Sequence, residues 1–82
     1  MTYKEQYEGS TSWQRKISVM NLFHVMQCTA HKGWTIKKTA SYFEVSVGLV
    51  SENLKLADRL DELREVDSRN KALEKLRNGS PA

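Results

Sequence analysis

Two short helical patterns lie side by side in the middle of the chain, separated by only three residues, "EVS" at 44–46. The first pattern begins after Thr35 and has an apolar face made of Ile36, Ala40 and Phe43. The second begins at Ser46 and has an inner stripe made of Val47, Val50, Leu54 and Ala57. Helices joined by so short a turn must pack against each other through these faces, so the pattern predicts a helix-turn-helix.

The residue types at the turn fit this prediction. Ala40 is small enough to lie where the two helices cross, and Phe43 can seal the junction beside it. Val45 is an apolar plug within the turn, and Val50 is its anchor on the second helix. Thr35 and Ser46 are residues that favour helix N-caps.

The flanking segments predict a small all-α domain of about four helices, spanning residues 10–77. A capping box of Thr11 and Gln14 begins a largely buried helix that ends near the left-handed position Gly33. Its stripe is Trp13, Ile17, Met20 and His24, widened by Val19, Leu22, Phe23, Val25 and Met26. A last helix follows a cap at Asp67 or Ser68, runs to about Arg77 with Ala72, Leu73 and Leu76 apolar, and is closed by Gly79. Residues 1–9 are predicted to be a flexible arm and residues 78–82 a flexible tail.

A second apolar stripe runs beside the first and needs a cover, which leaves two alternatives. Either the first or the last helix of the same chain packs on it, or a second copy does so in a homodimer. The stripe consists of Leu49, Leu56, Leu60 and Leu63.

Composition narrows the function classes. The 82 residues suffice for one domain, and a lone cysteine, Cys28, excludes an internal disulfide and favours a reducing compartment. The chain shows no membrane-length apolar run, and "MTYKEQYEGS" lacks the apolar core of a signal peptide, so we expect a cytoplasmic protein without membrane contact. Residues 10–43 contain five cations and no acid, giving +5, as polyanion binding requires: Arg15, Lys16, Lys32, Lys37 and Lys38.

Residues 35–57 resemble the helix-turn-helix of ParB-type plasmid and chromosome partition proteins and related phage and plasmid regulators. The similarity rests on "LVSENLKLA", in which a β-branched residue and three polar ones precede Leu, a basic residue and Leu: Val50, Ser51, Glu52, Asn53, Leu54, Lys55 and Leu56. It covers about the middle third of the chain, without the family's nucleotide-binding region. Glu44 departs from the pattern, because this left-handed turn position is usually Gly and a Cβ there costs roughly 1 kcal/mol.

The resemblance implies double-stranded DNA as the partner, in a bacterial or phage-infected cell. The second helix would enter the major groove, with Glu52 accepting from a cytosine amino group and Lys55 reaching guanine or phosphate. The implied recognition residues are Ser46, Val47, Gly48, Ser51, Glu52, Lys55 and Arg59. The implied phosphate contacts are Thr35, Lys37, Lys38 and Lys32.

Catalysis and cofactors are not expected. His24, Cys28 and His31 share a helix face, but a second Cys and a third His are missing from the sequence, so zinc is rejected. Cys28 beside a His lacks an evident orienting group and oxyanion site. We also expect no small-molecule substrate.

Three functions therefore stay open at this point. The first is a small sequence-specific DNA-binding regulator or partition-type recognition module. The second is a helical oligomeric assembly protein, such as a small terminase-like component of phage DNA packaging, for which the leucine stripe would form the interface. The third is an adaptor that uses the motif only to bind protein, without salt-sensitive DNA affinity.

Overall fold

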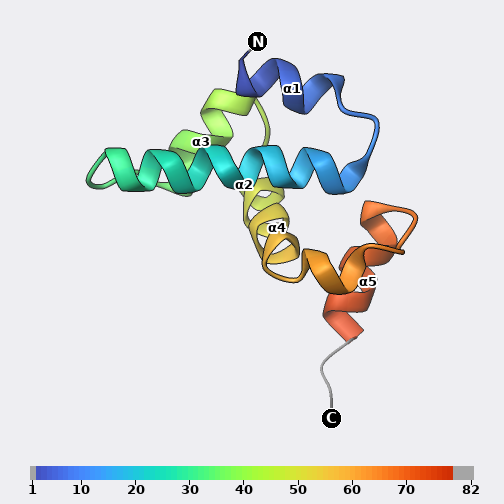
Figure 1. Cartoon of the computed structure of the whole chain (residues 1–82). Helices are drawn as coiled ribbons and strands as arrows, with labels where there is room; N and C mark the ends of the chain where they lie inside the picture. Colours follow the sequence, from blue (N-terminus) through green and yellow to red (C-terminus); the bar gives the residue numbers. More distant parts are fainter. Residues whose placement is uncertain (1, 79–82) are drawn as a thin grey trace.

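The computed structural model describes residues 2–78, and its regular structure there is entirely helical (Figure 1). The small all-α fold predicted from the sequence is confirmed. The elements are α1 (Tyr3–Gly9), α2 (Trp13–Ala30), α3 (Ile36–Phe43), α4 (Val47–Asp58), the 3-10 turn η1 (Leu60–Leu63) and α5 (Arg69–Asn78).

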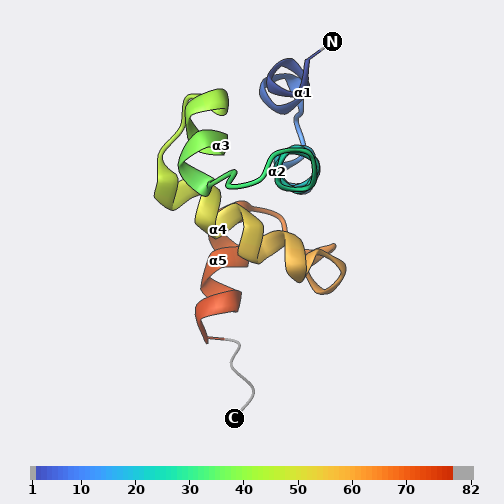
Figure 2. The ribbon, with the colours of Figure 1, turned by 90° about the vertical axis from the view of Figure 1, so that its left-hand side faces the viewer.

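The long helix α2 is the centre on which the other elements pack. Figure 2 looks along its axis and shows α1 on one side and the α3–α4 pair on another. A first core cluster joins α2, α3 and α4 through Met20, Phe23, Ala40, Phe43 and Val50. Burial of these side chains fixes the α3–α4 pair against α2, because removing apolar surface from water contributes about 25 cal/mol per Å².

A second core cluster closes the other end of the molecule. It brings together Ile17 of α2, Leu56 of α4, Leu63 of η1 and Ala72 of α5. The indole Nε1 of Trp13 also donates a hydrogen bond to the carbonyl oxygen of Val66 at 2.9 Å. The start of α2 is thereby tied to the segment that leads into α5.

The described part of the N-terminal segment forms the helix α1, whereas the sequence predicted a flexible arm over residues 1–9. Thr2 and Glu5 form a reciprocal capping box at the start of α1. Tyr3 packs on Phe23 with ring centroids 5.6 Å apart, and Tyr7 packs on Phe43 at 5.1 Å. Tyrosines four residues apart share one face of a helix, and here that face covers the first core.

The first predicted helix is present, but two of its details differ. Ser12, and not Thr11, is the N-cap, because the Ser12 hydroxyl accepts the hydrogen bond from the Arg15 amide. The helix is also less buried than expected, since Leu22, Val25 and Met26 keep 52%, 51% and 45% of their surface exposed. They lie outside both core clusters. The predicted end is confirmed: α2 stops at Ala30, and Gly33 has a φ of 84°.

The buried stripe of α4 lies between the two stripes predicted for it. Val50, Asn53 and Leu56 are buried, whereas Val47 is exposed and Leu54 and Ala57 are half-buried. The buried face differs from either predicted stripe because α4 packs against three helices, α2, α3 and α5. A stripe facing one neighbour alone would be narrower.

Half of the leucine stripe is buried within the chain. Leu56 and Leu63 belong to the second core, Leu49 packs on the first core, and Leu60 is half-buried. Leu56 and Leu63 are thus packed within the chain, as the first alternative expects, while Leu49 and Leu60 keep part of their surface exposed. The cap predicted at Ser68 is present at the start of α5. The Ser68 hydroxyl accepts a hydrogen bond from the Lys71 amide. Gly79 and the rest of the predicted tail, apart from Asn78, lie outside the described residues.

Candidate nucleic-acid interface

The turn between α3 and α4 has the backbone conformation that the sequence suggested. Glu44 is left-handed, with φ 58° and ψ 46°, and its amide donates to the carbonyl oxygens of Ala40 and Ser41. The Val45 amide donates to the Ala40 carbonyl as well, at 3.0 Å. An ion pair between Lys4 and Glu44 ties the turn to α1. The ends of α3 and α4 are thus held in one arrangement.

Both predicted N-caps are present. The Thr35 hydroxyl accepts from the Lys38 amide at 3.4 Å, and the Ser46 hydroxyl accepts from the Leu49 amide at 3.1 Å. Ala40 and Phe43 are buried at the junction, and Val45 packs against the same core. We refer to residues 35–58 as the α3–turn–α4 unit.

The first turn of α4 presents small side chains to solvent. Ser46, Val47 and Gly48 are exposed, and Ser51 is half-buried on the next turn. A Cβ placed on Gly48 would meet nothing within 4 Å. We call Ser46, Val47, Gly48 and Ser51 the α4 tip. Its lack of bulk would allow another molecule to approach the helix backbone closely.

Glu52 is engaged within the chain. Its carboxylate lies 3.0 Å from the Nη2 of Arg69, at the start of α5. The Nε of the same guanidinium donates to the Oδ1 of Asn53 at 2.7 Å. Asn53 is buried, and its Nδ2 lies 3.3 Å from the sulfur of Met20. Neither the role of Arg69 nor the burial of Asn53 could be predicted from the sequence, because the two residues are 16 positions apart.

The two cations predicted further along α4 lie in different surroundings. Lys55 is exposed and borders a groove of about 370 Å³ between α4 and α5, which is lined by Glu52, Lys55, Leu73, Leu76 and Arg77. Arg59 caps the far end of α4, with its guanidinium 3.7 Å from Glu62. At about 1.5 Å of rise per residue, it lies roughly 20 Å along the axis from Ser46. The structure therefore does not bring Arg59 together with the α4 tip.

The predicted phosphate contacts gather around the start of α3. Thr35, Lys37 and Lys38 occupy its cap and first turn, and all three are exposed. The Lys38 ammonium lies 5.6 Å from the ring centroid of Trp34. Lys32 is exposed in the turn that leads from α2. The positive end of the helix dipole adds to these charges, so this end of α3 can attract an anion.

The histidines and the cysteine do not converge on a common point. His24 Nδ1 lies 2.6 Å from the Thr39 hydroxyl, while its Nε2 lies 3.5 Å from the Cys28 sulfur. His31 instead packs on Trp34, with ring centroids 5.7 Å apart. Among residues 2–78, no three side chains of the metal-binding types come close enough to share an ion.

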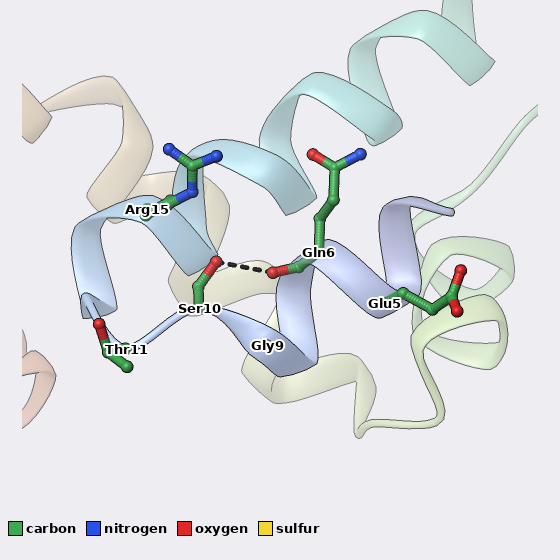
Figure 3. A pocket seen from close by; sticks show the side chains of 6 residues that line it. All are labelled: Glu5, Gln6, Gly9, Ser10, Thr11 and Arg15. Atoms are coloured by element: carbon green, nitrogen blue, oxygen red, sulfur yellow. Dashed lines mark hydrogen bonds between the residues drawn. The ribbon is translucent and has the colours of Figure 1, made fainter. Parts of the chain in front are cut away.

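A hollow of about 300 Å³ lies where α1 leads into α2, and its lining is shown in Figure 3. The Ser10 hydroxyl is engaged there with the Gln6 carbonyl at 2.6 Å. Glu5 and Arg15 lie at opposite ends of the hollow in this view. Its polar groups therefore do not converge as they would in a binding site.

Comparison with known proteins gives no relative: no protein-family model, no curated protein and no solved structure matches the chain. Within the described part, every helix is too short or too polar to cross a membrane. The geometry of the α3–turn–α4 unit is therefore the feature from which a function can be inferred.

Proposed function

We propose that this protein binds double-stranded DNA through the α3–turn–α4 unit, used as a helix-turn-helix. The observation that carries the proposal is the α4 tip, a capped helix end whose exposed side chains are small. A major groove admits an α-helix when no bulky side chain holds it away from the base edges. The hydroxyl of Ser51 and the methyl groups of Val47 are of the kinds that contact base edges.

The start of α3 is proposed to contact the phosphate backbone. Lys37 and Lys38 provide two exposed ammonium groups beside the helix N-terminus, and Lys32 adds a third from the preceding turn. Such contacts fix the position of a protein on DNA while base contacts provide the sequence preference. The proposed mechanism is binding alone, in a small regulator or partition-type recognition module.

An assembly role is the second candidate, and one observation favours it. Leu22, Val25 and Met26 are about half exposed and share one face of α2 by their spacing, and the Met26 sulfur accepts a hydrogen bond from the Tyr3 hydroxyl of α1. Exposed apolar side chains that cluster in this way are typical of protein contacts. An oligomer built through α2 and a DNA-binding dimer with half-sites about one helical turn apart are both compatible with this surface.

The phosphate contacts are tested by measuring DNA affinity at several salt concentrations. A variant with Lys37→Ala and Lys38→Ala should lower the slope of log K against log salt by about 2, since each phosphate contact contributes about 0.9. The matched control is Lys71→Ala with Lys75→Ala, which removes the same charge from exposed positions of α5. Equal slopes in the two variants would contradict a phosphate contact by α3.

Groove entry by the α4 tip has a separate test, Gly48→Leu. A Cβ at this exposed position meets nothing within 4 Å, so the fold should tolerate the substitution. Stability should stay the same or rise, because Gly in a helix costs about 0.5–1 kcal/mol relative to Ala. DNA affinity should fall about tenfold or more, equivalent to about 1.4 kcal/mol.

Gly9→Leu is the control for that variant, because Gly9 also faces open space but lies in α1. We expect it to leave DNA affinity unchanged. A folded wild-type protein without DNA affinity at low salt would refute the proposal and favour the assembly role.

A further inference from the structure

Arg69 belongs to α5, outside the α3–turn–α4 unit, yet its guanidinium reaches two consecutive residues of α4. It contacts the Glu52 carboxylate at 3.0 Å and the Asn53 amide oxygen at 2.7 Å. Its own side chain is only 27% exposed, whereas that of Glu52 is 45% exposed. One cation therefore links a buried polar group to an acid at the surface.

The position of Glu52 makes this link relevant to DNA. Glu52 follows Gly48 by four residues, so both lie on the same side of α4. A carboxylate on the side that approaches phosphates is repelled, and the repulsion grows as water is excluded. With Arg69 bound, the pair has no net charge.

Asn53 adds a geometric constraint to the electrostatic one. Its Nδ2 contacts the Met20 sulfur of α2, and its Oδ1 accepts from Arg69 of α5. Because the amide is buried, its carbonyl oxygen needs this donor. The rotation of α4 about its own axis is therefore fixed from both sides.

We propose that Arg69 is a positioning residue of the DNA-binding surface, which neutralises Glu52 and holds α4 through Asn53. This inference rests on the proposed function. It assigns Glu52 a role different from the one that the family resemblance implied. The carboxylate is occupied by Arg69, and the sequence preference comes from the α4 tip instead.

The test is a double-mutant cycle on DNA affinity, with the full chain and random and host-derived DNA fragments as probes. Arg69→Met keeps an unbranched side chain at this position and removes the guanidinium with its charge. We expect it to weaken binding about tenfold, because the Glu52 carboxylate is then uncompensated near phosphates. Adding Glu52→Gln to this variant should restore affinity to within about threefold of wild type.

Arg69→Met and the double variant both leave the Asn53 oxygen without its donor, and they differ only at Glu52. Comparing their affinities therefore separates the effect of the Glu52 charge from the effect of the lost Asn53 hydrogen bond. Arg64→Met is the matched control: it makes the same change in net charge and breaks an exposed pair in which Arg64 lies 3.4 Å from Asp61. We expect it to change affinity less than about twofold, since exposed pairs contribute little. A double variant as weak as Arg69→Met would overturn the neutralising role.

Glu52→Gln alone decides the question if Arg69→Met does not fold, as judged by circular dichroism. With Arg69 retained, we expect binding about threefold tighter, with the same sequence preference, because one negative charge is removed. Loss of the sequence preference would overturn the inference and return Glu52 to base recognition. Wild-type protein that binds no DNA refutes the proposed function, whereas wild-type binding with Arg69→Met equal to Arg64→Met refutes only the role of Arg69.

Discussion

The hydroxyl oxygen of Thr39 accepts a hydrogen bond from the indole Nε1 of Trp34 at 2.8 Å. The same oxygen lies 2.6 Å from His24 Nδ1, so one buried side chain joins α3 to α2 and to the turn between them. Thr39→Val keeps the shape and removes both partners' hydrogen bonds. We expect a loss of about 1–3 kcal/mol in the free energy of unfolding, measured by urea denaturation.

Thr29→Val is the control for that prediction. Thr29 is exposed, and its hydroxyl donates only to the Val25 carbonyl within α2. The change should alter the free energy of unfolding by less than about 0.5 kcal/mol. Similar losses in both variants would show that the Thr39 hydrogen bonds contribute nothing beyond the substitution itself.

Ala40 should not tolerate a larger side chain, because it is buried in the first core between α3 and α4. Ala40→Leu should lower the free energy of unfolding by about 1–3 kcal/mol through overpacking. Ala30→Leu makes the same change at an exposed position of α2 and should be nearly neutral. Thermal unfolding of the two variants compares them directly, and equal midpoints would contradict close packing at Ala40.

Glu44 provides a test of backbone strain, since it is the non-glycine residue of the described part with a positive φ. Glu44→Gly and Glu44→Ala both remove the ion pair with Lys4, but only glycine relieves the left-handed conformation. The glycine variant should therefore be about 1 kcal/mol more stable than the alanine variant. Chemical denaturation measures the free energy of unfolding of both variants. An alanine variant more stable than the glycine variant would contradict strain at this position.

The capping box of α1 predicts a pH dependence. Hydrogen bonds with Thr2 hold the pKa of Glu5 below its ordinary value of 4.5. The backbone of Thr2 has the larger effect, and its hydroxyl has the smaller one. The ionised form therefore stabilises α1, and this contribution is complete above pH 4.5 and is lost as the pH falls through the lowered pKa. NMR signals of the Thr2 amide should report this loss on acidification.

Two variants check the origin of that dependence. Glu5→Gln should abolish the titration seen at Thr2, because the amide group does not ionise in this range. Glu8→Gln, at an exposed position of the same helix, should leave it in place. A titration that survives in Glu5→Gln would assign it to another group.

Local patterns explain most of what could be predicted from the sequence. The caps Thr35, Ser46 and Ser68, the left-handed Glu44 and the end of α2 depend on residues within one or two helical turns. The same local rules would have found α1, because Thr2 and Glu5 have the spacing of a capping box.

Other features could not be predicted, because they depend on partners far apart in the chain. Asn53 is polar and belongs to neither of the two apolar stripes of α4. Its burial becomes evident only from its contacts with Met20 and Arg69. The exposure of Leu22 likewise follows from the placement of the other helices on α2. Apolar periodicity alone does not say which face of such a helix is covered.

The hydrogen bond between Trp13 and Val66 joins residues 53 positions apart, and it lies beside the core that Ile17, Leu56 and Leu63 share. The α3–turn–α4 unit is therefore held at its far end by segments from both ends of the sequence. A protein engineer who transplanted residues 35–58 alone would leave Leu56 and Asn53 without their covering partners. A portable version would need the start of α2, η1 and α5 as well.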